Sequence, residues 1–143
     1  MNVLYSIVNK DYEDIVMIHN LYFDNKWNTK DIETMCNIEN YSFVIIKTAK
    51  EVLAYAILYD TLDSLDLFEI AVKNNYRNKG LGMKLLRAVF DKYKNKDILL
   101  EVNEDNVNAL SFYSKNGFVK ISIRKNYYKN NKNAIIMVKK YDV

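Results

Sequence analysis

The feature of this sequence that most restricts its fold is the pair Gly80 and Gly82, because the 143 residues include only three glycines and no proline. The pair separates two hydrophobic patterns. Residues 64–72 before it read as a strand, whereas the apolar residues after it recur at the spacing of one helix face, at Leu81, Leu85, Leu86, Val89, Phe90 and Tyr93. This order predicts backbone N–H groups that are open to an anion at the start of the helix.

The turn at residues 76–82 has the composition of a pyrophosphate site. Arg77 and Lys79 add positive charge beside the glycines, and the positive end of the helix dipole lies at the same place. A dinucleotide fold would require a third glycine, and a Walker A loop would require Gly-Lys-Ser/Thr; both are missing. A plain strand-to-helix turn with a basic rim is the alternative interpretation of this segment taken alone.

The remaining pattern predicts a mixed α/β domain around one sheet that spans residues 1–143. Two β-branched and aromatic runs, 41–47 and 52–60, predict a hairpin through a polar turn. Apolar residues at helical spacing predict three further helices, and we expect Asp11 to cap the first. The other expected strands are 4–8, 97–102, 118–125 and 134–140, and the other expected helices are 12–23, 29–37 and 106–116.

Two residue types that occur once exclude several kinds of site. The single cysteine, Cys36, rules out an internal disulfide and a cysteine-based zinc site, and the single histidine, His19, argues against a Ser-His-Asp triad. We expect Cys36 to be a small apolar filler and His19 to be a structural residue at or near the surface. We expect no bound metal.

Charge and hydropathy limit the partners. The net charge of +3, from 21 basic and 18 acidic residues, is too mild to indicate direct nucleic-acid binding. No run of about 18 apolar residues predicts a membrane-spanning helix, and the N-terminus lacks the regions of a signal peptide. The sequence therefore predicts a cytoplasmic protein without membrane contact.

A second group of residues follows the glycine turn at fixed spacing. Its members are Glu101, Val102, Asn106, Ala109, Phe112, Tyr113, Gly117 and Phe118. Together with the Arg77-x-x-Gly80-x-Gly82 run, this group resembles the two signature motifs of the GNAT superfamily of N-acetyltransferases. The resemblance implies one GNAT domain with a twisted, mostly antiparallel seven-stranded sheet and four helices, in which the single parallel strand pair opens to admit acetyl-CoA.

Three further runs, at residues 67–72, 124–128 and 134–137, resemble bacterial ribosomal-protein alanine N-acetyltransferases. Trp27 stands where that family often has an aromatic residue of the substrate loop. The resemblance implies that the acceptor is a protein N-terminal α-amine, most often alanine of a small ribosomal protein. An α-amine has a reference pKa of about 7.7–8.0, against about 10.4 for lysine, so a carboxylate base suffices for it. We expect a monomer or a weak dimer.

Two alternatives stay open at this point. One is a GNAT enzyme that acetylates a small amine such as a polyamine, an amino sugar or a drug, and it would have a closed pocket instead of an open peptide groove. The other is a module that binds acyl-CoA without turnover. The presence of both Glu101 and Tyr113 argues against the second alternative.

The resemblance also implies roles for individual residues. Glu101 would be the general base and Tyr113 the general acid for the CoA thiolate, while Asn106 would both cap its helix and bond the pantetheine arm. A β-bulge would open the strand at Ile70 and Val72. The expected acetyl-CoA-binding residues are Ile70, Ala71, Val72, Arg77, Asn78, Lys79, Gly80, Leu81, Gly82, Met83 and Asn106.

Three side chains near this region allow two interpretations each. Glu69 could be a second carboxylate beside the substrate groove, or it could be solvated. Tyr127 and Tyr128 could form a wall of the peptide groove, or they could cover a sheet face.

Overall fold

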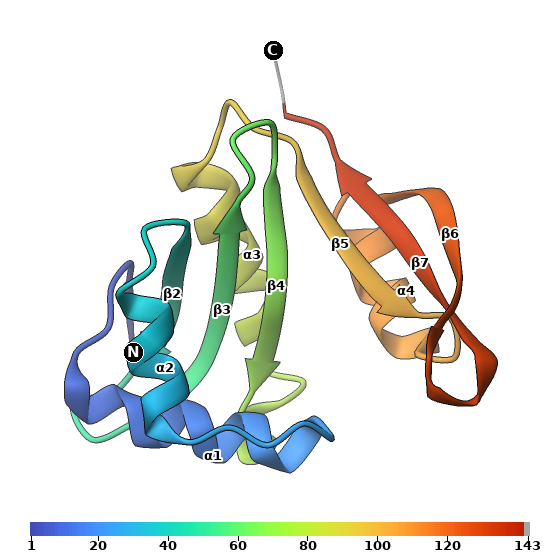
Figure 1. The fold of residues 1–143 in the computed structure, drawn as a ribbon. Coiled ribbons are helices and arrows are strands. Elements are labelled where there is room, and N and C mark those ends of the chain that lie inside the picture. Colours follow the sequence, from blue (N-terminus) through green and yellow to red (C-terminus); the bar gives the residue numbers. More distant parts are fainter. Residues whose placement is uncertain (142–143) are drawn as a thin grey trace.

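The computed structural model describes residues 1–141, which form a seven-stranded sheet with four α-helices (Figure 1). The strands are β1 (Asn2–Leu4), β2 (Tyr41–Lys47), β3 (Val52–Asp60), β4 (Leu65–Val72), β5 (Ile98–Asn103), β6 (Val119–Tyr128) and β7 (Lys132–Lys139). The helices are α1 (Tyr12–Tyr22), α2 (Thr29–Cys36), α3 (Leu81–Lys92) and α4 (Val107–Lys115). The expected mixed architecture is confirmed.

The strand order in the sheet is β1-β2-β3-β4-β5-β7-β6. Neighbouring strands are antiparallel except for β4 and β5, which are the one parallel pair in the described part of the chain. The predicted hairpin of β2 and β3 is present, and the Thr48 amide donates to the Glu51 carbonyl at its turn. The parallel pair follows from the α3 crossover, since parallel neighbours require a long connection.

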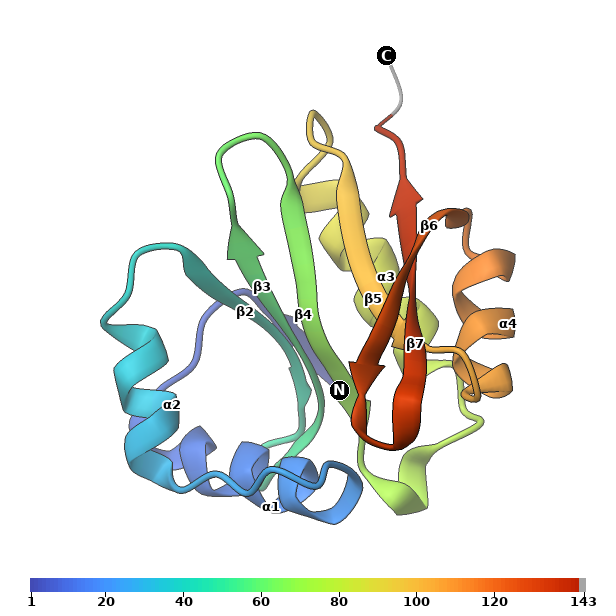
Figure 2. The same cartoon turned by 45° about the vertical axis from the view of Figure 1, so that its right-hand side comes forward.

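Two hydrophobic cores lie on opposite faces of the sheet, and the alternation of side chains along the strands separates them. On β2, Phe43 and Ile45 pack towards α1 and α2, whereas Val44 and Ile46 pack towards α3. Figures 1 and 2 show α1 and α2 on one face and α3 and α4 on the other. The stripe predicted for α3 is buried in the second core.

The N-terminal segment differs from the prediction. The first strand is Asn2–Leu4 and not residues 4–8, because the chain leaves the edge of the sheet after Leu4 and enters a short 3-10 helix at Asn9–Asp11. Asp11 makes no side-chain cap bond to α1. Its carboxylate instead accepts from the Val8 amide and pairs with Lys47 at 2.8 Å.

Two smaller differences concern exposure and element length. Cys36 is exposed, so its prediction as an apolar filler is wrong. Strand β6 continues past residue 125 and includes Tyr127 and Tyr128, because Tyr128 pairs with Lys132. Within residues 1–141, no helix has the length and hydrophobicity needed to cross a membrane.

Candidate active site

The two central strands of the sheet separate along most of their length. Strands β4 and β5 pair only at Leu65 with Ile98 and at Asp66 with Leu99. In β4, Phe68 is an extra residue, since Leu67 pairs with Leu58 and Glu69 with Ile57 on β3. This β-bulge bends the strand away from β5, as bulges do. Figure 1 shows the two strands diverging from their paired ends.

The separation leaves backbone groups of β4 without a strand partner. The Lys73 amide donates to the Leu53 carbonyl of β3 at 2.8 Å. Because alternate residues of a strand direct their backbone groups to opposite sides, Ala71 also faces β3, whereas Ile70 and Val72 face the gap. The Val72 carbonyl is reached by Nε of Arg77 at 3.4 Å. Ile70 and Val72 thus lie along the open edge, and the backbone of Ala71 does not.

The glycine turn places an anion cradle beside this gap. Asn78 and Gly80 have φ values of 62° and 79°, and Gly80 is the N-cap residue of α3. In the described chain, the six amides from residue 78 to residue 83 donate no hydrogen bond to protein. A Cβ added at Gly80 would meet no atom within 4 Å, so this side of the turn is open. Such a run of free amides fits a phosphate group.

The other motif residues at the turn have different surroundings. Gly82 packs closely against α4, since a Cβ there would lie 3.1 Å from Cζ of Phe112. The Arg77 guanidinium lies 3.8 Å from the ring centroid of Tyr22, and the Lys79 ammonium lies 5.7 Å from that of Tyr76. The Arg77 guanidinium is thus held by an aromatic ring of α1 that sequence reasoning did not predict, whereas Lys79 contacts an aromatic ring of the turn itself.

Glu101 lies near the end of β5 on the face opposite α3 and α4. Its neighbours Leu100 and Val102 are in the core below α3, so alternation directs Glu101 to the other face. Its Oε1 pairs with Nη1 of Arg124 at 2.9 Å. Burial first, and then the charge of Glu101, raise the pKa values of Asp66 and Tyr128. Arg124 is a residue of this site that the sequence analysis assigned no role.

Tyr113 lies on α4, on the α3 side of the sheet. Its ring packs against Phe112 and, edge to face, against Phe118. Burial raises the pKa of Tyr113 to about 12. Among the described residues, no group hydrogen-bonds its hydroxyl. Asn106 caps α4 as expected, with Oδ1 accepting from the Ala109 amide at 3.1 Å.

The face that carries Glu101 is open on its β5-β7-β6 half, since α4 lies behind these strands in Figure 1. Arg124 and Tyr127 of β6 are exposed there, with the guanidinium 5.0 Å from the ring centroid. Across the gap, Phe68 is half exposed and meets Tyr41 edge to face. Aromatic side chains thus border the open face on both sides of the gap.

His19 is fully buried, so its prediction as a surface or partly buried residue is wrong. It lies on α1 and pairs with Glu69 at 2.8 Å. This pair bears on the alternative that Glu69 is solvated. That carboxylate is not solvated, because its side chain is only 7% exposed. Burial raises the pKa of Glu69, while hydrogen bonds from Tyr55 and His19 act in the opposite direction.

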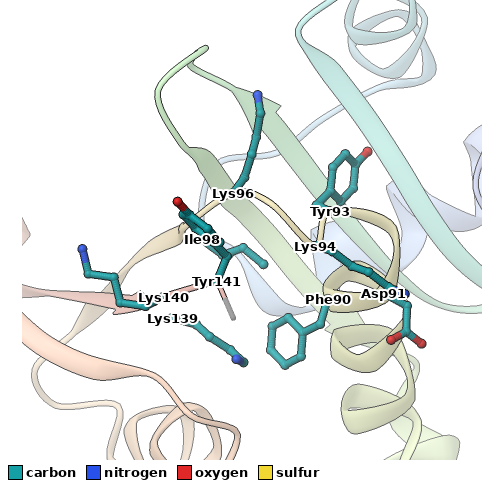
Figure 3. A pocket seen from close by; sticks show the side chains of 9 residues that line it. All are labelled: Phe90, Asp91, Tyr93, Lys94, Lys96, Ile98, Lys139, Lys140 and Tyr141. Carbon is teal, nitrogen blue, oxygen red and sulfur yellow. The ribbon is translucent and has the colours of Figure 1, made fainter. Parts of the chain in front are cut away.

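A separate cavity of about 230 Å³ lies at the far end of α3 (Figure 3). It is lined by Phe90 of α3, by Tyr93 just after this helix, by Tyr141 and by four lysines. Two of these lysines are already paired, Lys96 with Asp60 and Lys140 with Asp97. No motif residue lines this cavity. In the 141 described residues, no group of acidic, histidine and cysteine side chains could hold a metal ion.

Comparison with known proteins finds a matching family, related sequences and a similar solved structure. The acetyltransferase (GNAT) family profile matches residues 12–118. The [ribosomal protein bS18]-alanine N-acetyltransferases of Escherichia coli and Haemophilus influenzae are each 30% identical to this chain, and each alignment covers 96% of it. These alignments cover 96% and 97% of the two relatives. The crystal structure of the Escherichia coli ribosomal-protein-S18-alanine N-acetyltransferase superposes with a TM-score of 0.86 at 28% identity, covering 99% of this chain and 94% of that one.

Proposed function

Since the chain belongs to the GNAT acetyltransferase family and is an acetyl-CoA-dependent N-acetyltransferase, we propose that its acceptor is the N-terminal α-amine of a ribosomal protein that begins with alanine. The observation that carries the proposal is the gap between β4 and β5, in a sheet that has the Glu101 carboxylate on one face and Tyr113 on the other. The relatives named for alanine acetylation support the choice of acceptor.

The cradle and the open strand edge fit acetyl-CoA. The free amides of residues 78–83 would hold the pyrophosphate, with the Lys79 charge beside them. The backbone groups of Ile70 and Val72 would bond the pantetheine arm and the thioester oxygen. Acetyl-CoA supplies an activated acetyl thioester, so the chain has to position an amine and move two protons.

Glu101 takes the proton of the acceptor amine in this proposal, directly or through water. The carboxylate lies on the open face, where an acceptor can approach from solvent. Arg124 holds one carboxylate oxygen, which fixes its orientation and leaves the other free for the amine. An α-amine with a pKa of about 8 is partly deprotonated near neutral pH, so a carboxylate is a strong enough base to remove its proton.

Tyr113 gives a proton to the departing thiolate in this proposal. Its pKa of about 12 keeps the phenol protonated throughout the physiological range. Within residues 1–141, no acceptor bonds the hydroxyl and competes for this proton. Its position on the α3 side of the sheet agrees with entry of the coenzyme from that side and of the amine from the other.

A turnover screen tests the acceptor. The protein is incubated with acetyl-CoA and one of three amines: a peptide that begins with alanine, the same peptide N-terminally blocked and carrying an internal lysine, or spermidine. We expect the free alanine peptide to have the highest kcat/KM, because an open face accommodates an extended chain. A higher value for spermidine or for the blocked peptide would overturn the assignment to protein N-termini.

A further inference from the structure

Three side chains from separate elements form a buried hydrogen-bonded cluster around Glu69. Its Oε2 is 2.8 Å from Nδ1 of His19 on α1 and 2.6 Å from the hydroxyl of Tyr55 on β3. His19 and Tyr55 are fully buried. On its other side, the His19 ring contacts the segment after α1, with Nε2 2.6 Å from the carbonyl oxygen of Asn25. We call His19, Tyr55 and Glu69 the His19 cluster.

The partners of His19 determine how many protons the cluster holds. A carbonyl oxygen only accepts, so Nε2 must carry a proton and donate it to Asn25. Nδ1 and Oε2 then need one more proton between them. The pair is either imidazolium with carboxylate or imidazole with carboxylic acid, and it is electrically neutral in both cases. The burial of these groups is therefore compatible with the cost of burying charge.

The cluster connects two parts of the proposed active site. Glu69 directly follows the Phe68 bulge and precedes Ile70 on the open edge. The His19 ring is stacked between Phe23 and Trp27, with ring centroids 4.9 Å and 3.5 Å away. Within residues 1–141, His19 is the only side chain that hydrogen-bonds both the segment 23–28 and the sheet. It thus joins this segment to the strand edge where the thioester would lie.

We propose that the His19 cluster positions the acceptor, by fixing the segment 23–28 against the bulge of β4. The proposal rests on the proposed function, because it assumes that the acceptor amine approaches on the α1 face. His19 is then a positioning residue that acts through Trp27 and Glu69 and does not contact the amine itself. The anion cradle at α3 contains no member of the cluster, so the contacts to the pyrophosphate do not depend on it.

His19→Phe separates the hydrogen bonds from the ring packing. Phenylalanine retains an aromatic ring between Phe23 and Trp27 but breaks the links to Glu69 and Asn25. We expect kcat/KM for the alanine peptide to fall about tenfold or more, while KM for acetyl-CoA stays within twofold. We do not expect a complete loss of activity, because Asn20 still bonds the Trp27 backbone at 2.9 and 3.0 Å. Unchanged acceptor kinetics in a folded variant would overturn the proposal.

Two substitutions of Glu69 provide a rescue test that does not depend on the folding of His19→Phe. In Glu69→Gln, the side-chain amide has two protons to donate. Nδ1 of a neutral His19 can accept one of them, and the hydroxyl oxygen of Tyr55 can accept the other. We expect this variant to keep acceptor kinetics within about threefold. Glu69→Leu removes both partners and should behave like His19→Phe. An equal loss of kcat/KM in Glu69→Gln and Glu69→Leu would contradict positioning by hydrogen bonds.

Asp11→Asn is the matched control, because Asp11 is also buried and its pair with Lys47 also fixes α1, at the opposite end of the helix. We expect a lower melting temperature with unchanged kcat/KM for the alanine peptide. The same fall in kcat/KM as in His19→Phe would show a general effect of loosening α1, and it would overturn the proposal.

The intrinsic fluorescence tests the cluster without turnover, since Trp27 is the sole tryptophan. In His19→Phe and Glu69→Leu, we expect the emission maximum to move to longer wavelength as the segment loosens and the indole is hydrated. Glu69→Gln should retain the wild-type maximum. If the wild-type protein acetylates no peptide, the proposed function fails, whereas an unchanged emission in all three variants refutes the cluster's role in itself.

Discussion

Tyr113→Phe tests the proposed general acid with little structural disturbance. The substitution removes one hydroxyl that has no hydrogen-bond partner among the described residues, and the ring contacts with Phe112 and Phe118 remain. No partner is left unsatisfied, so the stability change should be within about 0.5 kcal/mol, the range of substitutions that break no specific interaction. Any large loss of activity would therefore come from chemistry.

The size of that loss follows from the role. General acid catalysis contributes roughly 10²–10⁴-fold to a rate, which corresponds to about 2.7–5.4 kcal/mol of barrier. The wild-type phenol, with a pKa of about 12, is protonated in all but roughly 1 in 10⁴ molecules at pH 8. We expect kcat to fall at least about 100-fold at this pH, with KM for acetyl-CoA unchanged.

The assay measures kcat by release of the CoA thiol, beside a thermal melt of the same preparation. Tyr93→Phe is the matched control, because its hydroxyl bonds Oγ of Ser42 at 2.8 Å at the far end of α3. Loss of that bond should cost about 0.5–1.5 kcal/mol and lower the melting temperature by roughly 2–6 °C, without altering kcat. A kcat in Tyr113→Phe within threefold of wild type would refute the acid role.

Two further predictions concern the cradle and the base. Gly80→Val should raise KM for acetyl-CoA at least about tenfold, because a side chain at a φ of 79° strains the turn and covers the free amides. Gly117→Val is the control, since a side chain at a φ of 93° causes similar strain at the end of α4. This variant should leave KM for acetyl-CoA unchanged. Glu101→Gln should reduce kcat/KM for an alanine peptide most near pH 7 and least near pH 9.5, because an amine with a pKa of about 8 needs no base once it is deprotonated. A deficit that is constant over this range would indicate that Glu101 binds the acceptor and does not take its proton.

The sequence was sufficient to predict the elements whose formation depends on local patterns. The stripe of α3, the hairpin of β2 and β3 and the stop of α4 at Gly117 all follow from spacing and turn residues close in the chain. The opening of β4 from β5 was predicted only through the resemblance, since no local pattern marks Phe68 as an extra residue. A bulge depends on the register against the neighbouring strand, and that register is a tertiary property.

The residues that were missed are those whose role arises from contacts distant in sequence. Glu101 and Arg124 are 23 positions apart, and His19 and Glu69 are 50 apart. A lone histidine on a helix gives no signal of burial by itself. The one available signal was Phe23 and Trp27, which follow the histidine closely in the sequence and stack on its ring. The packing reason for Gly82 depends in the same way on α4.

The two proposed proton-transfer groups lie on opposite faces of the sheet. The charge of Glu101 raises the pKa values of Asp66 and Tyr128, which lie on its own face. Burial alone accounts for the raised pKa of Tyr113, without a contribution from Glu101. In the proposed mechanism, Glu101 and Tyr113 act on one thioester in the gap between β4 and β5, so the bulge that opens this gap is as necessary to the chemistry as either side chain.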